Sequence, residues 1–285
     1  MRSWQWPESG PVRIGSEAHK RMFCRVLLDT HNPYKPAVIE WPALNDDELA
    51  RITGLPIWDI AVQTEGNAGV RVMAYAHAVA DPLLREALVM DGGEEQRHKV
   101  VLHNMVNAYG VKLAPEPPYP APKDPEWGFM TTGFSECIDS FFAFGLFALA
   151  KQSGFFPPAL VETFEPVMQE ECRHILFFAN WFDWHRRNLP WWRKPGFALK
   201  TLGVFLTIFK ERLLTAKDVS GGENFTATGH KSMGIDATPG DLLALCLAEN
   251  DRRFAGYDAR LVRPVFAPRM ARLALLFLKR SAPKK

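Results

Sequence analysis

The stretch Glu94-Glu95-Gln96-Arg97-His98 decides the fold, because it occurs a second time as Glu170-Glu171-Cys172-Arg173-His174. Each copy lies in a segment with the apolar periodicity of a helix. A Glu and a His three residues apart on a helix are separated by about 300° in rotation and about 4.5 Å in rise, so both leave one face and can bind one metal ion. Composition predicts roughly half a copy of Glu-x-x-His by chance, but only on the order of a few thousandths of the full string. Two full copies are therefore not a coincidence.

A lone glutamate precedes each copy at a similar distance. Glu65 precedes Glu95 by 30 residues, and Glu136 precedes Glu171 by 35 residues. If the chain turns near residues 80–82 and 154–158, antiparallel helices rising about 1.5 Å per residue bring all these groups to nearly the same height. We therefore predict a metal centre in a four-helix bundle. Its predicted ligands are Glu65, Glu95, His98, Glu136, Glu171 and His174.

The chemistry of these ligands favours iron or manganese. Four carboxylates and two imidazoles match the preference of both metals, and four acids can share a protein interior only when cations neutralise them. The alternative is a set of surface Glu and His residues on solvated helix faces. Apolar residues flank the motifs at 100–102 and 175–178, which leaves less polar face than a surface helix needs.

The rest of the chain predicts an all-α protein in three parts. Residues 1–56 are expected to form an irregular N-terminal arm with one short helix that begins at Asn45. Residues 57–187 are expected to form the bundle, and 188–285 a C-terminal helical extension. The predicted bundle helices are 57–80, 82–109, 127–152 and 157–187; the predicted extension has helices at 191–217 and 241–254, an irregular loop at 220–240 and an apolar, basic tail.

Composition narrows the compartment and the class of protein. A net charge of +2 argues against a nucleic-acid-binding protein. The four cysteines have no Cys-x-x-Cys spacing, which excludes a rubredoxin-type iron site and fits a reducing cytosol. The N-terminus has no apolar core of a secretory signal, and the apolar stretches 141–150 and 197–209 are shorter than the roughly 20 residues of a membrane span. We therefore expect a cytoplasmic protein.

The doubled string, with its preceding glutamates, resembles the soluble di-iron carboxylate proteins of the ferritin-like superfamily. This group includes acyl-carrier-protein desaturases, the hydroxylase subunits of bacterial multicomponent monooxygenases and the aerobic magnesium-protoporphyrin ester cyclase. The resemblance covers roughly residues 57–187 and implies a ferritin-like four-helix bundle, two iron ions or an iron–manganese pair, and O2 as a co-substrate. It further implies that the acid before each ligand glutamate accepts the ring N–H of a ligand histidine and is held by an arginine, Glu94 with Arg97 and Glu170 with Arg173. The alternative is an ordinary ion pair between residues three apart.

The resemblance also implies a role for Ser140, one turn after Glu136. A hydroxyl residue at this place relays protons to the reacting oxygen in the related enzymes. A serine that bonds back to its own helix is the alternative. The aromatic run 141–147 is explained by core packing, and a cavity for an apolar substrate is a further interpretation.

We therefore predict an O2-activating di-iron oxidoreductase, a monooxygenase, desaturase or oxidative-cleavage enzyme, that acts on an apolar small-molecule or acyl-type substrate. Its expected electron donor is a ferredoxin or a reductase. One alternative is a non-catalytic metal store or a peroxide-detoxifying protein of the ferritin-like type. Another is a radical-generating di-metal subunit, although Leu102 stands where that family carries a tyrosine.

Two features outside the bundle complete the predictions. The stretch 191–194, the apolar segment 197–209 with residues 210–212 after it, and the tail 270–285 combine aromatic, aliphatic and basic residues as interfacial helices do. This composition predicts peripheral contact with a membrane surface. Packing on the bundle or on a second subunit of a homodimer is the alternative. The remaining histidines are expected to be ordinary polar or packed residues. They are His19, His31, His77, His103, His185 and His230.

Overall fold

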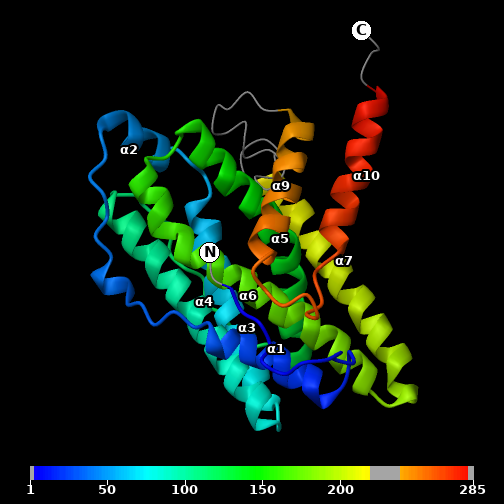
Figure 1. Ribbon diagram of the computed structural model, residues 1–285. Coiled ribbons are helices and arrows are strands. Elements are labelled where there is room, and N and C mark those ends of the chain that lie inside the picture. The colour runs from blue at the N-terminus through cyan, green and yellow to red at the C-terminus, as the bar shows by residue number, and fades with distance from the viewer. Residues whose placement is uncertain (1–2, 219–237, 282–285) are drawn as a thin grey trace.

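The computed structural model describes residues 3–218 and 238–281 of the chain, and most of these residues lie in helices (Figure 1). These ranges contain nine α-helices, two short 3-10 helices and no β-strand. The predicted all-α class is confirmed. His230, most of the predicted loop 220–240 and the last four residues lie outside the described ranges.

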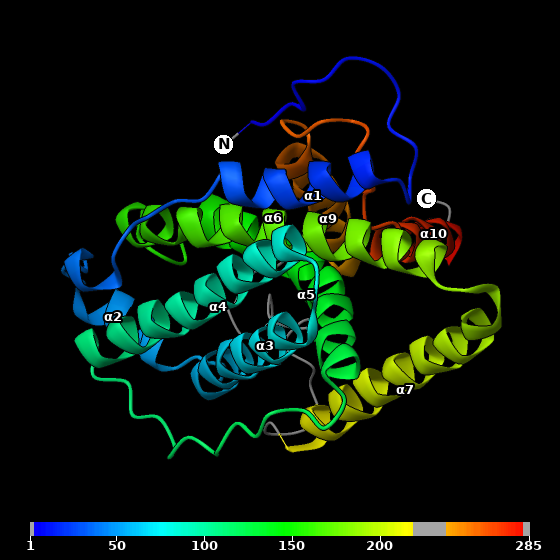
Figure 2. The same cartoon turned by 90° about the horizontal axis from the view of Figure 1, so that it is seen from below.

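Four long helices position the candidate site (Figures 1 and 2). Their bounds lie within two residues of those predicted, because capping residues and prolines mark most of their starts. Asp81 caps one helix by accepting from the Leu84 amide, and Asp124 caps another through the Trp127 amide. Gly154, at φ 66°, ends the helix that Asp124 starts. The four helices are α3 (Trp58–Ala78), α4 (Pro82–Ala108), α5 (Pro125–Ser153) and α6 (Pro158–Asn188).

Two glycines let α3 and α4 approach closely beside the site. A Cβ atom on Gly69 would lie 2.8 Å from Cγ of Gln96, and one on Gly92 would lie 2.9 Å from Cγ of Met73. The backbone of each glycine is also a near neighbour of the other. Larger residues here would push the helices apart next to Glu65 and Glu95.

The predicted N-terminal arm contains a helix that we did not expect. Helix α1 (Glu17–Asp29) begins at Ser16, whose hydroxyl accepts from the His19 amide, and lies along α6 (Figure 2). Its side chains at positions 22, 23, 26 and 27 are fully buried in the main core. The description of residues 1–56 as an irregular arm is therefore wrong for this segment. Helix α2 (Asp46–Thr53) starts as predicted, with a capping box between Asn45 and Glu48.

The C-terminal extension packs on α5. Helix α7 (Lys194–Asp218) follows the 3-10 helix η2 (Trp191–Arg193), and α9 (Pro239–Phe254) and α10 (Phe266–Ser281) complete the fold. Gly145 of α5 faces α9, and a Cβ atom there would lie 3.0 Å from the Cα atom of Cys246. Phe141 lies in one small core with residues of α9 and α10.

Helix α5 is the one described helix long and apolar enough to cross a membrane by length and composition, with a mean hydropathy of 1.4 over 18 residues. The apolar run 141–150 within α5 is shorter than this 18-residue window, so by itself it did not predict a span. Since α5 carries Glu136 and packs against α3, α6, α7 and α9, we interpret it as the central helix of the bundle.

Candidate metal centre

Helices α4 and α6 place two Glu–His pairs in one buried group. Glu95 and His98 come from α4, and Glu171 and His174 come from α6. One ligand atom from each of these residues lies within 4.8 Å of the others. The two imidazole rings are 5.6 Å apart between centroids. These four predicted ligands therefore meet in the interior, as the spacing of the two motifs requires.

The two lone glutamates approach the same group from α3 and α5. Oε2 of Glu65 lies 3.7 Å from Nδ1 of His98. Both oxygens of Glu136 are buried without a hydrogen-bond partner. Burial and the nearby carboxylates of Glu95 and Glu171 raise the pKa of Glu136 well above its ordinary value of 4.5. The structure thus places both lone glutamates near the group of four.

Several atoms in this centre lack a hydrogen bond. Nδ1 of His174 lies 2.7 Å from Oε1 of Glu95, and Nδ1 of His98 lies 3.1 Å from Oε1 of Glu171. Neither of these Nδ1 atoms forms a hydrogen bond, and Oε1 of Glu95 also has none. Each such buried atom costs about 1–3 kcal/mol. Cations between these atoms would satisfy them, so the donor set fits a pair of metal ions of the iron or manganese type.

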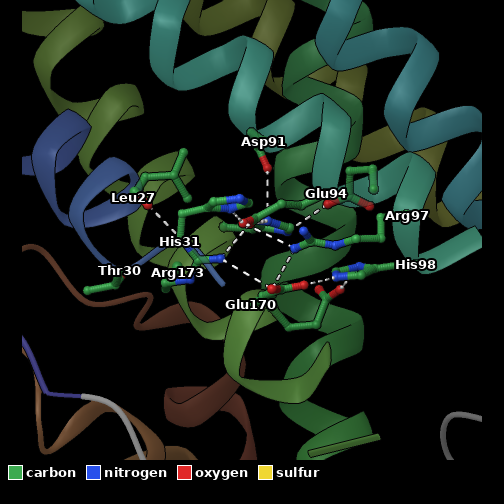
Figure 3. A network of polar contacts seen from close by, with 12 residues as sticks. Leu27, Thr30, His31, Asp91, Glu94, Arg97, His98, Glu170 and Arg173 are labelled. Atoms are coloured by element: carbon green, nitrogen blue, oxygen red, sulfur yellow. Dashed lines mark hydrogen bonds and ion pairs between the residues drawn. The ribbon is translucent and has the colours of Figure 1, made fainter. Parts of the chain in front are cut away.

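Carboxylates hold the outer nitrogens of both ligand histidines, and they do so across the bundle (Figure 3). Nε2 of His98 donates to Glu170 at 2.8 Å, and Nε2 of His174 donates to Glu94 at 2.8 Å. Because each Nε2 donates outward, each Nδ1 keeps its lone pair for a metal ion. The acid of each motif copy therefore orients the histidine of the other copy.

The arginines follow the same crossed pattern. Arg97 donates to Glu170 at 2.6 Å, and Arg173 donates to Glu94 at 2.5 Å. The predicted pairs within each copy are longer, at 3.4 Å for Arg97 with Glu94 and 3.8 Å for Arg173 with Glu170. The arginines prefer the opposite helix because the two motifs face each other across the bundle.

The contacts in this network shift the pKa values of the residues that form it. Burial opposes the charged form of Glu94, but hydrogen bonds from His174 and Arg173 outweigh it and lower the pKa of Glu94. Burial also opposes protonation of His98 and His174, yet the facing carboxylates raise the pKa of both rings well above 6.5. Without metal, the centre therefore holds protons where cations would bind.

Two residues of the N-terminal arm complete the network and were missed by the sequence analysis. Nδ1 of His31 lies 2.6 Å from Oε1 of Glu94. The hydroxyl of Tyr34 donates to Oε2 of Glu170 at 3.4 Å, and the guanidinium of Arg97 lies 4.3 Å from the Tyr34 ring centroid. Burial raises the pKa of Tyr34 to about 12, which keeps its hydroxyl protonated. The prediction that His31 is an ordinary residue is therefore incomplete.

Asp91 is a further acid that we did not predict. It is fully buried, and its Oδ1 lies 3.4 Å from Nε2 of His174 without a hydrogen bond. Burial raises its pKa to about 6. Asp91 precedes Glu95 by four residues, so both side chains lie on one face of the helix. This spacing could have predicted it.

Ser140 lies beside a predicted ligand. Its hydroxyl donates to Oε2 of Glu171 at 3.4 Å, so it does not bond back to its own helix. Its part in proton relay stays a prediction. The aromatic residues that follow it are accounted for by packing, since Phe141 lies in the core with α9 and α10 and Phe144 contacts Phe254.

Two cavities approach the centre from its outer side. One, of about 600 Å³, is lined by His31, Glu94, Arg97 and neighbouring residues of α4. The other, of about 410 Å³, is lined by Glu170, Arg173 and residues of α6 and the arm. Both reach the acids behind the ligand histidines.

In comparisons with protein-family models, curated proteins and solved structures, no significant match to the chain was found. The function of the protein is therefore inferred from the site itself.

Proposed function

We propose that the protein is an O2-dependent di-iron oxidoreductase that acts on an apolar small-molecule or acyl-type substrate. The observation that supports it best is the buried group of carboxylates and imidazoles whose inward atoms have no hydrogen bonds, while the outward nitrogens are held by acids. In a protein interior such a group has to be neutralised, by bound protons in the metal-free protein and by cations in the loaded one. The resemblance of the doubled motif to di-iron oxygenases supports the choice of reaction.

The proposed ligands divide between two ions. Each of α4 and α6 supplies one Glu and one His, and α3 and α5 supply one Glu each. Two ferrous ions, when bound, supply the electrons that reduce O2. The ligands are Glu65, Glu95, His98, Glu136, Glu171 and His174.

The chain itself contributes orientation, a proton and protection from water. Glu94 and Glu170 fix the tautomer and the angle of the ligand rings. Oγ of Ser140 lies 3.4 Å from Oε2 of Glu171. Its hydroxyl therefore carries a proton next to the proposed reaction site. Buried apolar side chains of α5 and α6, such as Phe144 and Ile175, belong to the main core and would limit the access of water.

Anaerobic titration with ferrous iron, followed by O2, tests the proposal. We expect two irons per chain, rapid O2 consumption and a new visible absorbance. Glu171→Ala should lose at least one iron and the absorbance, whereas Glu162→Ala, an exposed acid on the same helix, should behave like the wild type. A site that binds iron but stays spectrally silent and consumes no O2 would disprove an oxidase or oxygenase role.

The same preparation separates the alternatives. A metal store would form a very large hollow assembly in gel filtration and take up many more than two irons per chain. A peroxide-detoxifying protein would consume hydrogen peroxide faster than O2. A radical-generating subunit would give a stable organic radical signal in electron paramagnetic resonance, and a manganese-dependent centre would show a preference for manganese in metal analysis.

A further inference from the structure

The outward faces of α7 and α10 carry an unusual concentration of exposed apolar side chains. Among the described residues, 17 large hydrophobic side chains are exposed, and 13 of them lie between Trp191 and Leu278. Monomeric soluble proteins rarely expose contiguous apolar surface on this scale. The main members of this apolar face are Trp191, Trp192, Leu199, Leu202, Leu206, Phe209, Phe266, Met270, Leu273, Leu276 and Phe277.

Helix α7 is apolar on both sides, although the described residues cover only one of them. Phe197, Val204 and Ile208 are buried in the main core. Leu206 and Phe209 point away from it and are 63% and 69% exposed. A helix that is apolar all round is normally buried all round, so a second apolar phase is expected to cover the outer side of α7.

The outer side of α10 continues this surface. Ala267 and Ala271 pack inward against α9 and α5. Phe266, Met270 and Phe277 face outward and are 50–59% exposed. The rings of Phe205 and Phe266 join the two helices, with centroids 5.9 Å apart, and both helices lie at the same edge of the molecule (Figures 1 and 2).

The charges around this face are mainly basic, although Arg272 lies 3.9 Å from the exposed Asp251 of α9. Exposed basic side chains lie beside the apolar ones at Arg193, Lys194 and Lys210 in the α7 segment and at Arg269 and Arg272 in α10. The α10 sequence contains no acidic residue, and the exposed acid in the described part of α7 is Glu211. An apolar face with a basic border and paired exposed tryptophans has the composition of a helix that lies in a lipid interface.

We propose that the outer faces of α7 and α10 bind the surface of a membrane that contains anionic lipids. Apolar side chains enter the acyl boundary, the tryptophans lie at the headgroup level, and the basic residues contact lipid phosphates. A second copy of this chain is a poorer occupant, because a symmetric contact would bring the two basic borders together. The inference is independent of the metal reaction, although it would give an apolar substrate a route from the bilayer.

Flotation with lipid vesicles tests this inference on the full-length protein. We expect the wild type to float with phosphatidylcholine–phosphatidylglycerol vesicles and to bind pure phosphatidylcholine vesicles more weakly. Leu206→Glu combined with Phe277→Glu should weaken binding by about a hundredfold, because charged groups replace the inserted side chains. Arg193→Gln combined with Arg269→Gln should weaken binding to anionic vesicles by roughly twenty-five-fold, at about fivefold per basic residue.

A matched control uses exposed apolar residues elsewhere. Val38→Glu combined with Val100→Glu should leave flotation unchanged, since these side chains, 72% and 46% exposed, lie outside α7 and α10. All six substituted positions are exposed, so circular dichroism should show that each variant folds. Failure of the wild type to float with anionic vesicles would overturn the inference. So would a wild-type dimer that Leu206→Glu with Phe277→Glu converts to a monomer, because the face would then bind a second copy.

Discussion

Both oxygens of Glu136 are buried on α5 without a hydrogen-bond partner. Its pKa is raised well above 4.5 by burial and by the charges of Glu95 and Glu171. Glu136 therefore lowers the stability of the metal-free protein and is a proposed ligand in the metal-loaded protein. Its two effects have opposite signs and can be measured separately.

Replacing this acid should stabilise the apo protein and weaken metal binding. We expect Glu136→Leu to raise the free energy of unfolding of the metal-free protein by roughly 1–3 kcal/mol, because a buried unsatisfied polar group is removed. Metal analysis should show fewer than two irons per chain. Glu162→Leu, at an exposed position on α6, should change stability by less than about 0.5 kcal/mol and leave the iron content unchanged. A destabilised Glu136→Leu apo protein would contradict this account.

The crossed contacts of the two motifs give a second prediction for single residues. Glu94→Gln should disturb the ring of His174, to which Glu94 bonds at 2.8 Å, and leave His98 largely unchanged. Glu170→Gln should disturb His98 instead. Each variant should also bind metal about 10–100-fold more weakly. Nitrogen-15 NMR of histidine-labelled, zinc-loaded protein checks this assignment. A shift confined to the histidine of the same motif copy would contradict the crossed arrangement.

The sequence predicts the ligands well because they depend on local geometry. A Glu and a His three residues apart share a face on any helix, and equal distances from the turns set the heights. His31 and Tyr34 could not be found in this way. They reach Glu94 and Glu170 over separations of 63 and 136 residues, and no local rule fixes the path of the chain between α1 and η1 (Pro36–Val38).

At the scale of elements, caps and prolines explain why most of the helix starts were predictable. Helix α1 was missed although its signal was present. Ser16 is a capping residue, and positions 19, 22, 23, 26 and 27, all buried, follow the spacing of an amphipathic helix. The turn-rich sequence after them, at 31–36, suggested an irregular arm instead.

Substitutions of Gly145 and Gly93 by alanine test how closely the helices pack at these two positions. A Cβ atom on Gly145 would lie 2.3 Å from Sγ and 3.0 Å from Cα of Cys246, so Gly145→Ala must push α9 away from α5. We expect a loss of roughly 1–3 kcal/mol in the free energy of unfolding, measured with urea. Gly93→Ala is the matched change, because no atom lies within 4 Å of its Cβ position in the middle of α4. It should stabilise the protein by roughly 0.5–1 kcal/mol. If both changes altered the free energy of unfolding equally, the contact between Gly145 and α9 would not explain the loss of stability.

At the scale of the whole molecule, the N-terminal segment closes on the C-terminal part. The amide of Trp4 donates to the carbonyl of Gly256, and the amide of Asp258 donates to the carbonyl of Trp4. Arg260 then binds Asp258 and carbonyls of the N-terminal segment. Contacts over about 250 residues depend on the completed fold, so the sequence could not reveal them.

The metal centre also controls how the whole protein responds to pH. In the apo form the pKa values of Glu95 and Glu136 lie well above 4.5, and those of His98 and His174 well above 6.5. Between about pH 5 and pH 8 the folded apo protein therefore holds more protons than the unfolded chain. Stability must then fall as pH rises through this range. The lowered pKa of Glu94 acts only below its ordinary value of 4.5, where stability is lost as pH falls.

Metal should reverse this trend, because cations replace the protons that the ligands hold. We expect urea unfolding of the apo protein, with a chelator present, to lose about 1.4 kcal/mol per pH unit for each extra proton held between pH 5 and pH 8. With bound metal, stability should stay level or rise over the same range. Glu136→Leu should make the apo slope shallower, because Glu136 is one of the groups that hold a proton. An apo protein whose stability rises from pH 5 to pH 8 would show that these side chains are already ionised without cations, and the argument for a metal centre would lose its electrostatic basis.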